Sequence, residues 1–129
     1  MELRFAPNLS ERFGDPGQLS QVMLNLLQNG LHALPPAGGM LTLETGREED
    51  RCFFRVADTG SGIEERYLTR IFEPSFTTKP PGQGTGLGLA IAYRIVEDHG
   101  GIFKVDTQMG EGSRFTVYIP IPLQLERLP

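Results

Sequence analysis

Alternating glycines lead directly into an apolar helical pattern in residues 82–98, which read GQGTGLGLAIAYRIVED. Leu87–Asp98 is expected to form a helix that ends at Gly100, because glycine commonly follows a helix C-terminus. Backbone amides at a helix N-terminus attract anions, whereas a plain linker seldom runs straight into an apolar helix. The segment lacks the Gly-Lys-Ser/Thr of a Walker loop, and no strand precedes it as in a dinucleotide-binding fingerprint. It therefore predicts an anion-binding loop of another kind.

The segments on either side of this loop predict an α+β fold. A long amphipathic helix is expected over Asp15–Leu34, with Asp15 as its cap. Prolines and glycines predict a long mobile loop over Glu73–Gly86. The other expected elements are a short helix at Ile63–Phe72, strands at Glu2–Phe5, Met40–Thr45 and Cys52–Asp58, a charged turn at 46–50, and strands at Ile102–Asp106 and Arg114–Ile119. This order predicts a two-layer α/β sandwich, in which a mixed, mostly antiparallel sheet carries about three helices on one face.

The composition is that of a small acidic domain. The chain has 129 residues, 39% of them hydrophobic, which suits one domain over residues 1–129. A net charge of −4 and a pI of about 5.1 argue against nonspecific binding to nucleic acid or anionic membranes. The one cysteine, Cys52, excludes an internal disulfide and fits a reducing compartment. No apolar run approaches the roughly 20 residues of a membrane span, and MELRFAPNLS has no signal-peptide core, so a cytoplasmic domain is expected.

A stripe of polar side chains follows one face of the first long helix. At about 100° per residue, one face holds Gln18, Gln21, Asn25, Asn29 and His32. A solvated face is the ordinary explanation of such a stripe. Asparagine is a poor helix former, however, and the amide oxygens of Asn25 and Asn29, one turn apart, can converge on one hard cation. Because Mg²⁺ prefers oxygen ligands, the stripe is a candidate Mg²⁺ site.

The segment DTGSGI, residues 58–63, directly follows an expected strand. Alternation places Asp58 on the same, core-facing side as Val56, where a carboxylate is costly unless a donor bonds to it. A ligand amine such as that of adenine would do so, and Gly60 and Gly62 would let the backbone approach a flat ring. Two alternatives remain open: a strand-ending turn capped by Asp58, and the Asp-Thr-Gly of retroviral-type aspartic proteases. Two long amphipathic helices argue against the protease.

Taken in order, these segments resemble the motifs of the GHKL ATPase superfamily and, within it, of the sensor histidine kinases. The resembling segments are QVMLNLLQNGLHAL (21–34, asparagine box), DTGSGI (58–63, first glycine box), IFEPSFTTK (71–79, phenylalanine box), GTGLGLAIAYRIVEDHGG (84–101, second glycine box) and GSRFTVYIP (112–120, closing strand). Each motif alone is weak to moderate, but their order and spacing are highly specific. The resemblance covers residues 15–120 and implies the GHKL (Bergerat) form of the expected sandwich.

The resemblance implies that the chain binds ATP and Mg²⁺, and it assigns roles to the residues that match each motif. Asn29 would be the Mg²⁺ ligand, Asn25 would support it, and His32 stands where a basic residue often reaches the phosphates. The residues that would bind phosphate or anchor the nucleotide lid are Thr85, Gly86, Leu87 and Gly88, the lid anchors Phe72 and Phe76, and Lys79 at the terminal phosphate. Asp58 would accept the adenine amine, and the residues around the base would be Gly60, Gly62, Ile63 and, through water, Ser113.

Three comparisons with the family pattern refine the function that the resemblance implies. The gyrase, MutL and Hsp90 branches place a water-activating Glu where this chain has Asn25, an amide that cannot be a general base. Many kinases carry a Tyr that stacks on adenine where this chain has Ala33, so stacking would come from elsewhere. Neither His32 nor His99 has the acidic residue that follows a phospho-accepting histidine. The chain therefore resembles a catalytic fragment without its acceptor domain.

The implied function is to hold Mg-ATP and donate its γ-phosphate to a histidine on the dimerisation domain of a parent two-component sensor kinase. A response regulator would receive the phosphate indirectly, and the isolated domain would be a monomer. Three alternatives stay open at this point: a GHKL ATPase, an anti-sigma-type serine kinase, and a nucleotide sensor without catalysis.

Overall fold

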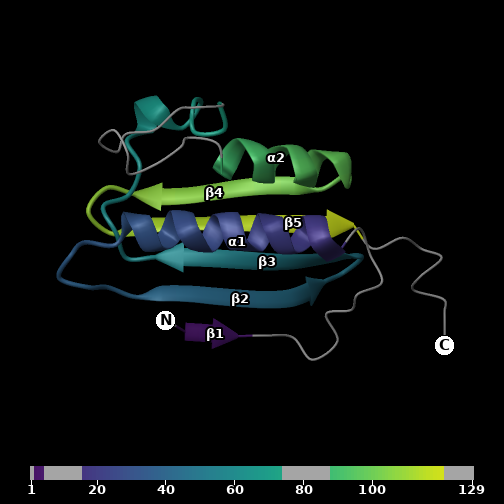
Figure 1. Cartoon of the computed structure of the whole chain (residues 1–129), viewed down its shortest axis with the longest axis horizontal. Coiled ribbons are helices and arrows are strands. Elements are labelled where there is room, and N and C mark those ends of the chain that lie inside the picture. The colour runs from purple at the N-terminus through teal and green to yellow at the C-terminus, as the bar shows by residue number, and fades with distance from the viewer. Residues whose placement is uncertain (1, 5–15, 74–87, 121–129) are drawn as a thin grey trace.

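The computed structural model describes residues 2–4, 16–73 and 88–120. In chain order the elements are β1 (Glu2–Arg4), α1 (Pro16–Ala33), β2 (Leu41–Glu48), β3 (Arg51–Asp58), a 3₁₀ turn (Glu65–Tyr67), α2 (Gly88–Asp98), β4 (Ile102–Gln108) and β5 (Gly112–Pro120). The five strands form one sheet in the order β1-β2-β3-β5-β4, antiparallel except for the parallel β1–β2 pair. Both α-helices lie on one face of it (Figure 1). The predicted two-layer α+β sandwich is confirmed.

The core lies between the two α-helices and the sheet, because helices and strands carry apolar residues at the spacing of their own geometry. On α1, Val22 and Leu26, four residues apart, have no exposed surface. On β3 every second residue is buried, and Phe54, Val56 and Asp58 lie on this face. The prediction that Asp58 faces the core is confirmed.

Helix α1 comes unusually close to β2 at Gly30. A Cβ atom built there would lie 2.4 Å from Cδ1 of Leu41, a buried residue of β2. Glycine weakens a helix interior by about 1 kcal/mol relative to alanine, so the close approach explains why a glycine stands here. It fixes the last turns of α1, which carry Asn29 and His32, against the sheet.

The β2–β3 hairpin is longer than the sequence predicts. Gly46–Glu48 pair with Arg51–Phe53 instead of forming the charged turn expected at 46–50. The turn is reduced to Glu49 and Asp50, and Glu49 takes a left-handed φ of 57°. Two-residue hairpin turns favour positive φ because their twist matches that of the strands.

The short helix expected over Ile63–Phe72 forms only in part. A 3₁₀ turn covers Glu65–Tyr67, and hydrogen bonds between residues three apart continue from Arg70 N–H to Tyr67 and from Glu73 N–H to Arg70. Successive tight turns bury Ile71 and bring Phe72 against α2, which one regular helix would not do. Within the described residues, two α-helices and this turn take the place of three helices.

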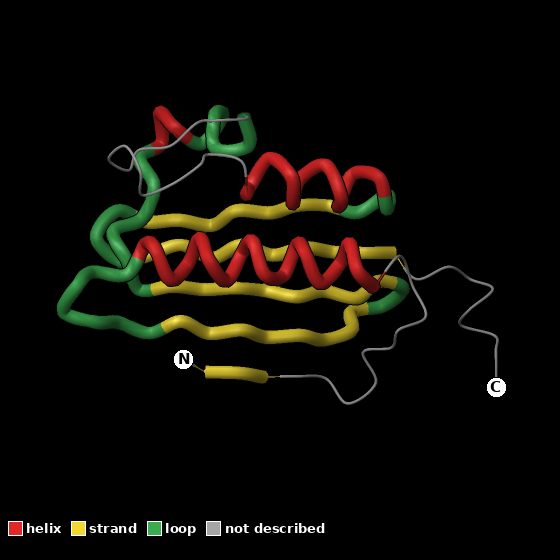
Figure 2. Tube along the Cα trace, viewed as in Figure 1, coloured by secondary structure: helices red, strands yellow, loops and turns green. Residues whose placement is uncertain are grey.

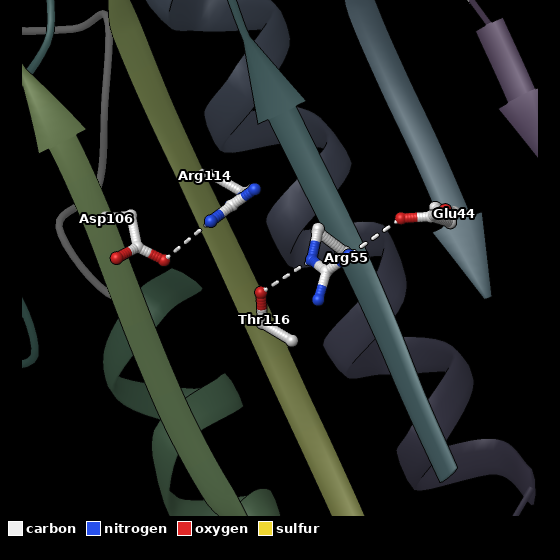
Figure 3. Close-up of polar contacts among 5 residues, drawn as sticks. All are labelled: Glu44, Arg55, Asp106, Arg114 and Thr116. Atoms are coloured by element: carbon white, nitrogen blue, oxygen red, sulfur yellow. Dashed lines mark hydrogen bonds and ion pairs between the residues drawn. The ribbon is translucent and has the colours of Figure 1, made fainter. Parts of the chain in front are cut away.

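The outer face of the sheet, away from the helices, is held by polar pairs across strands. The guanidinium of Arg55 on β3 donates to Oε1 of Glu44 at 2.8 Å and to Oγ1 of Thr116 at 3.0 Å, which links β2 to β5. Arg114 lies 3.4 Å from Asp106 across the β4–β5 pair (Figure 3). Such pairs contribute about 0.2–1 kcal/mol each. Because strand side chains alternate, Asp58 and Ser113 lie on the opposite, helix-covered face.

Candidate nucleotide-binding site

Three loops meet at one end of the sheet. They are the α1–β2 connection, the segment after β3, and the β4–β5 turn (Figure 2). The N–H of Gly110 in that turn donates to the carbonyl of Ser61 at 2.8 Å, and the N–H of Thr59 donates to the carbonyl of Met40 at 3.1 Å. These bonds join the three loops into one unit around the end of β3, where Asp58 lies.

Asp58 is a buried carboxylate held as an acceptor. Its residue is 6% exposed, its Oδ1 accepts the N–H of Gly60 at 2.9 Å, and the backbone N–H of Ser113 also donates to the carboxylate. Burial raises the pKa of Asp58 above its ordinary value of 3.8, and the two backbone hydrogen bonds lower it by less. The side chain is thus a desolvated acceptor, the group that would recognise a ligand amine.

Glycines around Asp58 are required by contacts within the chain. A Cβ on Gly60 would lie 2.3 Å from the carbonyl oxygen of Ala33 at the end of α1. One on Gly62, where φ is 80°, would lie 2.4 Å from the carbonyl oxygen of Gln108, and one on Gly112, where φ is 130°, would lie 1.9 Å from that of Asp58. Close backbone packing therefore explains Gly60 and Gly62 without a ligand; their expected approach to a flat ring stays a prediction.

Asn25 joins the two helices. The residue is 7% exposed, its Oδ1 accepts from Nε2 of Gln21 at 2.7 Å, and its Nδ2 donates to the carbonyl of Gly88, the first residue of α2, at 3.0 Å. The side chain of Asn25 is therefore not part of a solvated face. It fixes the start of α2, where helical amides attract anions, beside the polar stripe of α1.

Asn29 lies one turn beyond Asn25 on the same side of α1. The residue is half-buried, and among the described residues no hydrogen bond involves its side-chain amide. His32 follows in the last turn of α1 and is exposed. Across residues 2–4, 16–73 and 88–120, no three His, Cys, Asp or Glu side chains gather as metal ligands. A cation here would be bound by an amide oxygen, phosphate and water, a donor set that suits Mg²⁺.

The remaining predicted site residues divide into two groups. Ser113, at the start of β5, faces Asp58 in the β3–β5 register, and Ile63, in the segment after β3, is linked to Ser113 through Thr107. The rest lie outside the described residues: Phe76, Lys79, Thr85, Gly86 and Leu87. In the described part of the chain, neither helix has the length and apolarity to cross a membrane.

Comparison with known proteins assigns the family. Residues 14–123 match the model of the histidine kinase-, DNA gyrase B- and HSP90-like ATPases. The chain belongs to this ATPase family. The alternative interpretation of Asp-Thr-Gly as part of a retroviral-type aspartic protease is therefore wrong.

Relatives of this ATPase domain are sensor kinases. The sensor histidine kinase ZraS of Salmonella typhi is 42% identical over 123 residues, which is 94% of this chain and 26% of that protein. The catalytic domain of histidine kinase ThkA superposes with a TM-score of 0.76 at 34% identity, covering 92% of this chain and 78% of that one. Full-length ShkA in complex with AMPPNP superposes with a TM-score of 0.78 at 33% identity, covering 92% of this chain and 25% of that one. The chain thus spans about a quarter of ZraS.

Phe72, a predicted lid anchor, is held by rings that the sequence did not single out. It stacks on Tyr93 of α2 with centroids 4.6 Å apart and meets Phe103 of β4 edge-on at 4.8 Å. Phe103 in turn contacts the buried Phe115 of β5 at 6.1 Å. A hydrogen bond to Glu97 raises the pKa of Tyr93. The ring contacts of Phe72 therefore fix the end of the 3₁₀ segment against α2, the helix that Asn25 also contacts.

Replacing Phe72 with alanine should lower the free energy of unfolding by about 1–3 kcal/mol, because a half-buried ring and two aromatic contacts are lost. Phe72→Leu, which keeps most of the apolar volume, should cost less. Urea unfolding followed by circular dichroism measures both. A Phe72→Ala domain as stable as the wild type would mean that the stack with Tyr93 does not anchor this segment.

Proposed function

We propose that this domain binds Mg-ATP and donates the γ-phosphate to a histidine on the dimerisation domain of a two-component sensor kinase. The relatives support the class of reaction, since they are named sensor histidine kinases. The acceptor domain, and a response regulator that receives the phosphate from it, are part of the proposal. So are a cytoplasmic position of the domain and its monomeric state.

The adenine of ATP is proposed to bind at Asp58. The buried carboxylate offers a strong acceptor to the exocyclic amine, and its surroundings are backbone and side chains from three loops rather than bulk water. Ser113 faces it across the β3–β5 pair, and Ser113 and Ile63 are proposed to complete the base-binding group with Gly60 and Gly62. Two backbone N–H groups already donate to this carboxylate, and its remaining lone pairs can accept an N–H group from a ligand.

Mg²⁺ is proposed to bind at Asn29. Asn29 is half-buried and lies one turn beyond Asn25, which contacts the start of α2, and His32 follows one turn later to reach the phosphates. Bound there, Mg²⁺ would neutralise charge on the triphosphate. Lys79 and the loop residues Thr85, Gly86 and Leu87 are proposed to contact the phosphates as the family resemblance implies.

The observation that favours a kinase over a hydrolase is the side chain of Asn25. Its amide oxygen accepts from Gln21 within α1, and its amide nitrogen donates to Gly88 at the start of α2, so both ends of the side chain are engaged. An amide has no basic group with which to remove a proton from water. This position therefore supports a domain that keeps ATP intact until an acceptor is brought to it.

Phosphoryl transfer in trans tests the proposal. The isolated chain should bind Mg-ATP, hydrolyse it slowly and leave itself unlabelled, because neither His32 nor His99 is followed by the acidic residue of a phospho-accepting histidine. His99 is also engaged at the end of α2, where its Nδ1 lies 2.8 Å from the carbonyl oxygen of Ile95. Adding the parent's dimerisation domain as a separate polypeptide should produce a phosphorylated acceptor, slowly, because the link that raises the effective concentration is missing.

The stability of the product identifies the acceptor. A phosphohistidine is labile in acid and stable in base, and it should disappear when the acceptor histidine is replaced by glutamine. An acid-stable product would instead indicate a serine kinase, and rapid ATP hydrolysis by the chain alone an ATPase. If the chain binds ATP but transfers no phosphate to a folded acceptor domain, a nucleotide sensor without catalysis remains as the function.

A further inference from the structure

Thr107, on β4 beside the β4–β5 turn, links the two segments that surround Asp58. Its Oγ1 accepts the backbone N–H of Ile63 at 2.8 Å, lies 2.9 Å from Oγ of Ser113, and lies 3.2 Å from the carbonyl oxygen of Gly112. One hydroxyl thus contacts both the segment after β3 and the first residues of β5. The half-buried side chain is directed toward the candidate site and not toward the outer face.

One arrangement of protons satisfies all three contacts of this hydroxyl. A threonine hydroxyl has one proton to donate and two lone pairs to accept with. Thr107 donates to the carbonyl of Gly112 and accepts from the N–H of Ile63 and the hydroxyl of Ser113. The proton of Ser113 is then committed to Thr107, and the lone pairs of Ser113 Oγ are left for other partners.

Ser113 and Asp58 are neighbours in the sheet. They face each other in the β3–β5 register, they are 7% and 6% exposed, and the backbone N–H of Ser113 donates to the carboxylate of Asp58. With its proton turned to Thr107, Ser113 adds a second acceptor beside the carboxylate. An amino group fits two acceptors, directly or through water, whereas a carbonyl oxygen at the same place would meet lone pairs.

We propose that Thr107 is a positioning residue for base selectivity: it fixes Ser113 as an acceptor and holds the backbone of Ile63, so that the site prefers an adenine amine to a guanine carbonyl. The inference rests on the proposed binding of the base at Asp58. It assigns a role to a residue outside the five motifs, which acts through Ser113 and Ile63.

Replacement of Thr107 by valine and by serine tests this role. Valine keeps the shape and removes the hydroxyl, so Ser113 is free to turn its proton toward the base and the N–H of Ile63 loses its acceptor. Thr107→Val should reduce the ratio of ATP affinity to GTP affinity by about tenfold, mainly through weaker ATP binding. Thr107→Ser keeps the hydroxyl and should stay within about twofold of the wild-type ratio.

Calorimetric titration of each variant with Mg-ATP and Mg-GTP measures the ratio. Thr42→Val is a matched control, because Thr42 lies between the buried Leu41 and Leu43 on the opposite face of β2, and it should leave both affinities unchanged. An unchanged ratio in Thr107→Val overturns the inference. This includes the case in which ATP and GTP affinity fall by the same factor, which a purely structural role of Thr107 would produce.

Two further results separate this inference from the proposed function. If the wild-type chain fails to bind ATP, the proposed function is wrong, whatever Thr107 does. If Thr107→Val does not fold, hydrogen exchange of the Ile63 amide in the wild type and in Thr107→Ser decides the positioning role. The amide should be protected in both proteins; free exchange in the wild type would show that the Thr107 bond does not hold, and would overturn the inference.

Discussion

Asp58→Asn should weaken ATP binding by about 2–4 kcal/mol, or roughly 30- to 700-fold. The substitution keeps the size of the side chain and leaves an amide oxygen for the N–H of Gly60, so the fold should persist. It replaces one acceptor oxygen with a donor, however, and an adenine amine would then face N–H groups in a site with little water. A desolvated mismatch of this kind costs much more than one solvent-exposed hydrogen bond.

Titration of the folded variant with ATP and GTP measures the effect. Asp106→Asn makes the same chemical change on the outer face of the sheet, where Asp106 pairs with Arg114 (Figure 3), and should leave ATP affinity unchanged. ATP affinity of the wild type should also fall in acid, because a protonated Asp58 is no longer a full acceptor. Because burial raises the pKa of Asp58, the loss of ATP affinity should begin at a higher pH than it would for a carboxyl with the ordinary pKa of 3.8. Undiminished ATP affinity in Asp58→Asn would exclude Asp58 from the site.

Asn29→Ala should abolish the part of nucleotide affinity that depends on Mg²⁺, a loss of at least about tenfold, because ligand and support changes at metal sites commonly cost that much. The helix should survive, since alanine is a better helix former than asparagine, and no hydrogen bond of the Asn29 amide within the described residues would be lost. ATP titrations with Mg²⁺ and with EDTA separate the metal-dependent part from the rest.

Two neighbouring substitutions on α1 sharpen this test. Gln28→Ala, at an exposed position one residue earlier, should leave the Mg²⁺ dependence unchanged. Asn25→Ala removes the bond to Gly88 and should weaken nucleotide binding with and without Mg²⁺, because the start of α2 is no longer held against α1. A Mg²⁺ dependence that survives in Asn29→Ala would show that another group binds the metal.

Local patterns in the sequence determined the elements and the family. The burial of Asp58 follows from strand alternation, which needs only Phe54 and Val56 on the same side. Helix α1 follows from the spacing of Val22 and Leu26, and the order of the motifs predicted the ATPase family that residues 14–123 match. These features were predictable because each depends on residues a few positions apart or on the order of segments.

Tertiary structure alone decided how the site is held together. Thr107 lies just beyond the strand predicted to end at Asp106, and its contact with Ile63 spans 44 residues. The bond from Asn25 to Gly88 spans 63 residues, and Phe72 stacks on Tyr93 of α2 after a 3₁₀ turn and tight turns that replace the regular helix expected over Ile63–Phe72. No short-range pattern encodes such contacts, because they arise only when packing brings loops and helix ends together. The same packing explains Gly60, Gly62 and Gly112, whose missing side chains leave room for backbone from another segment.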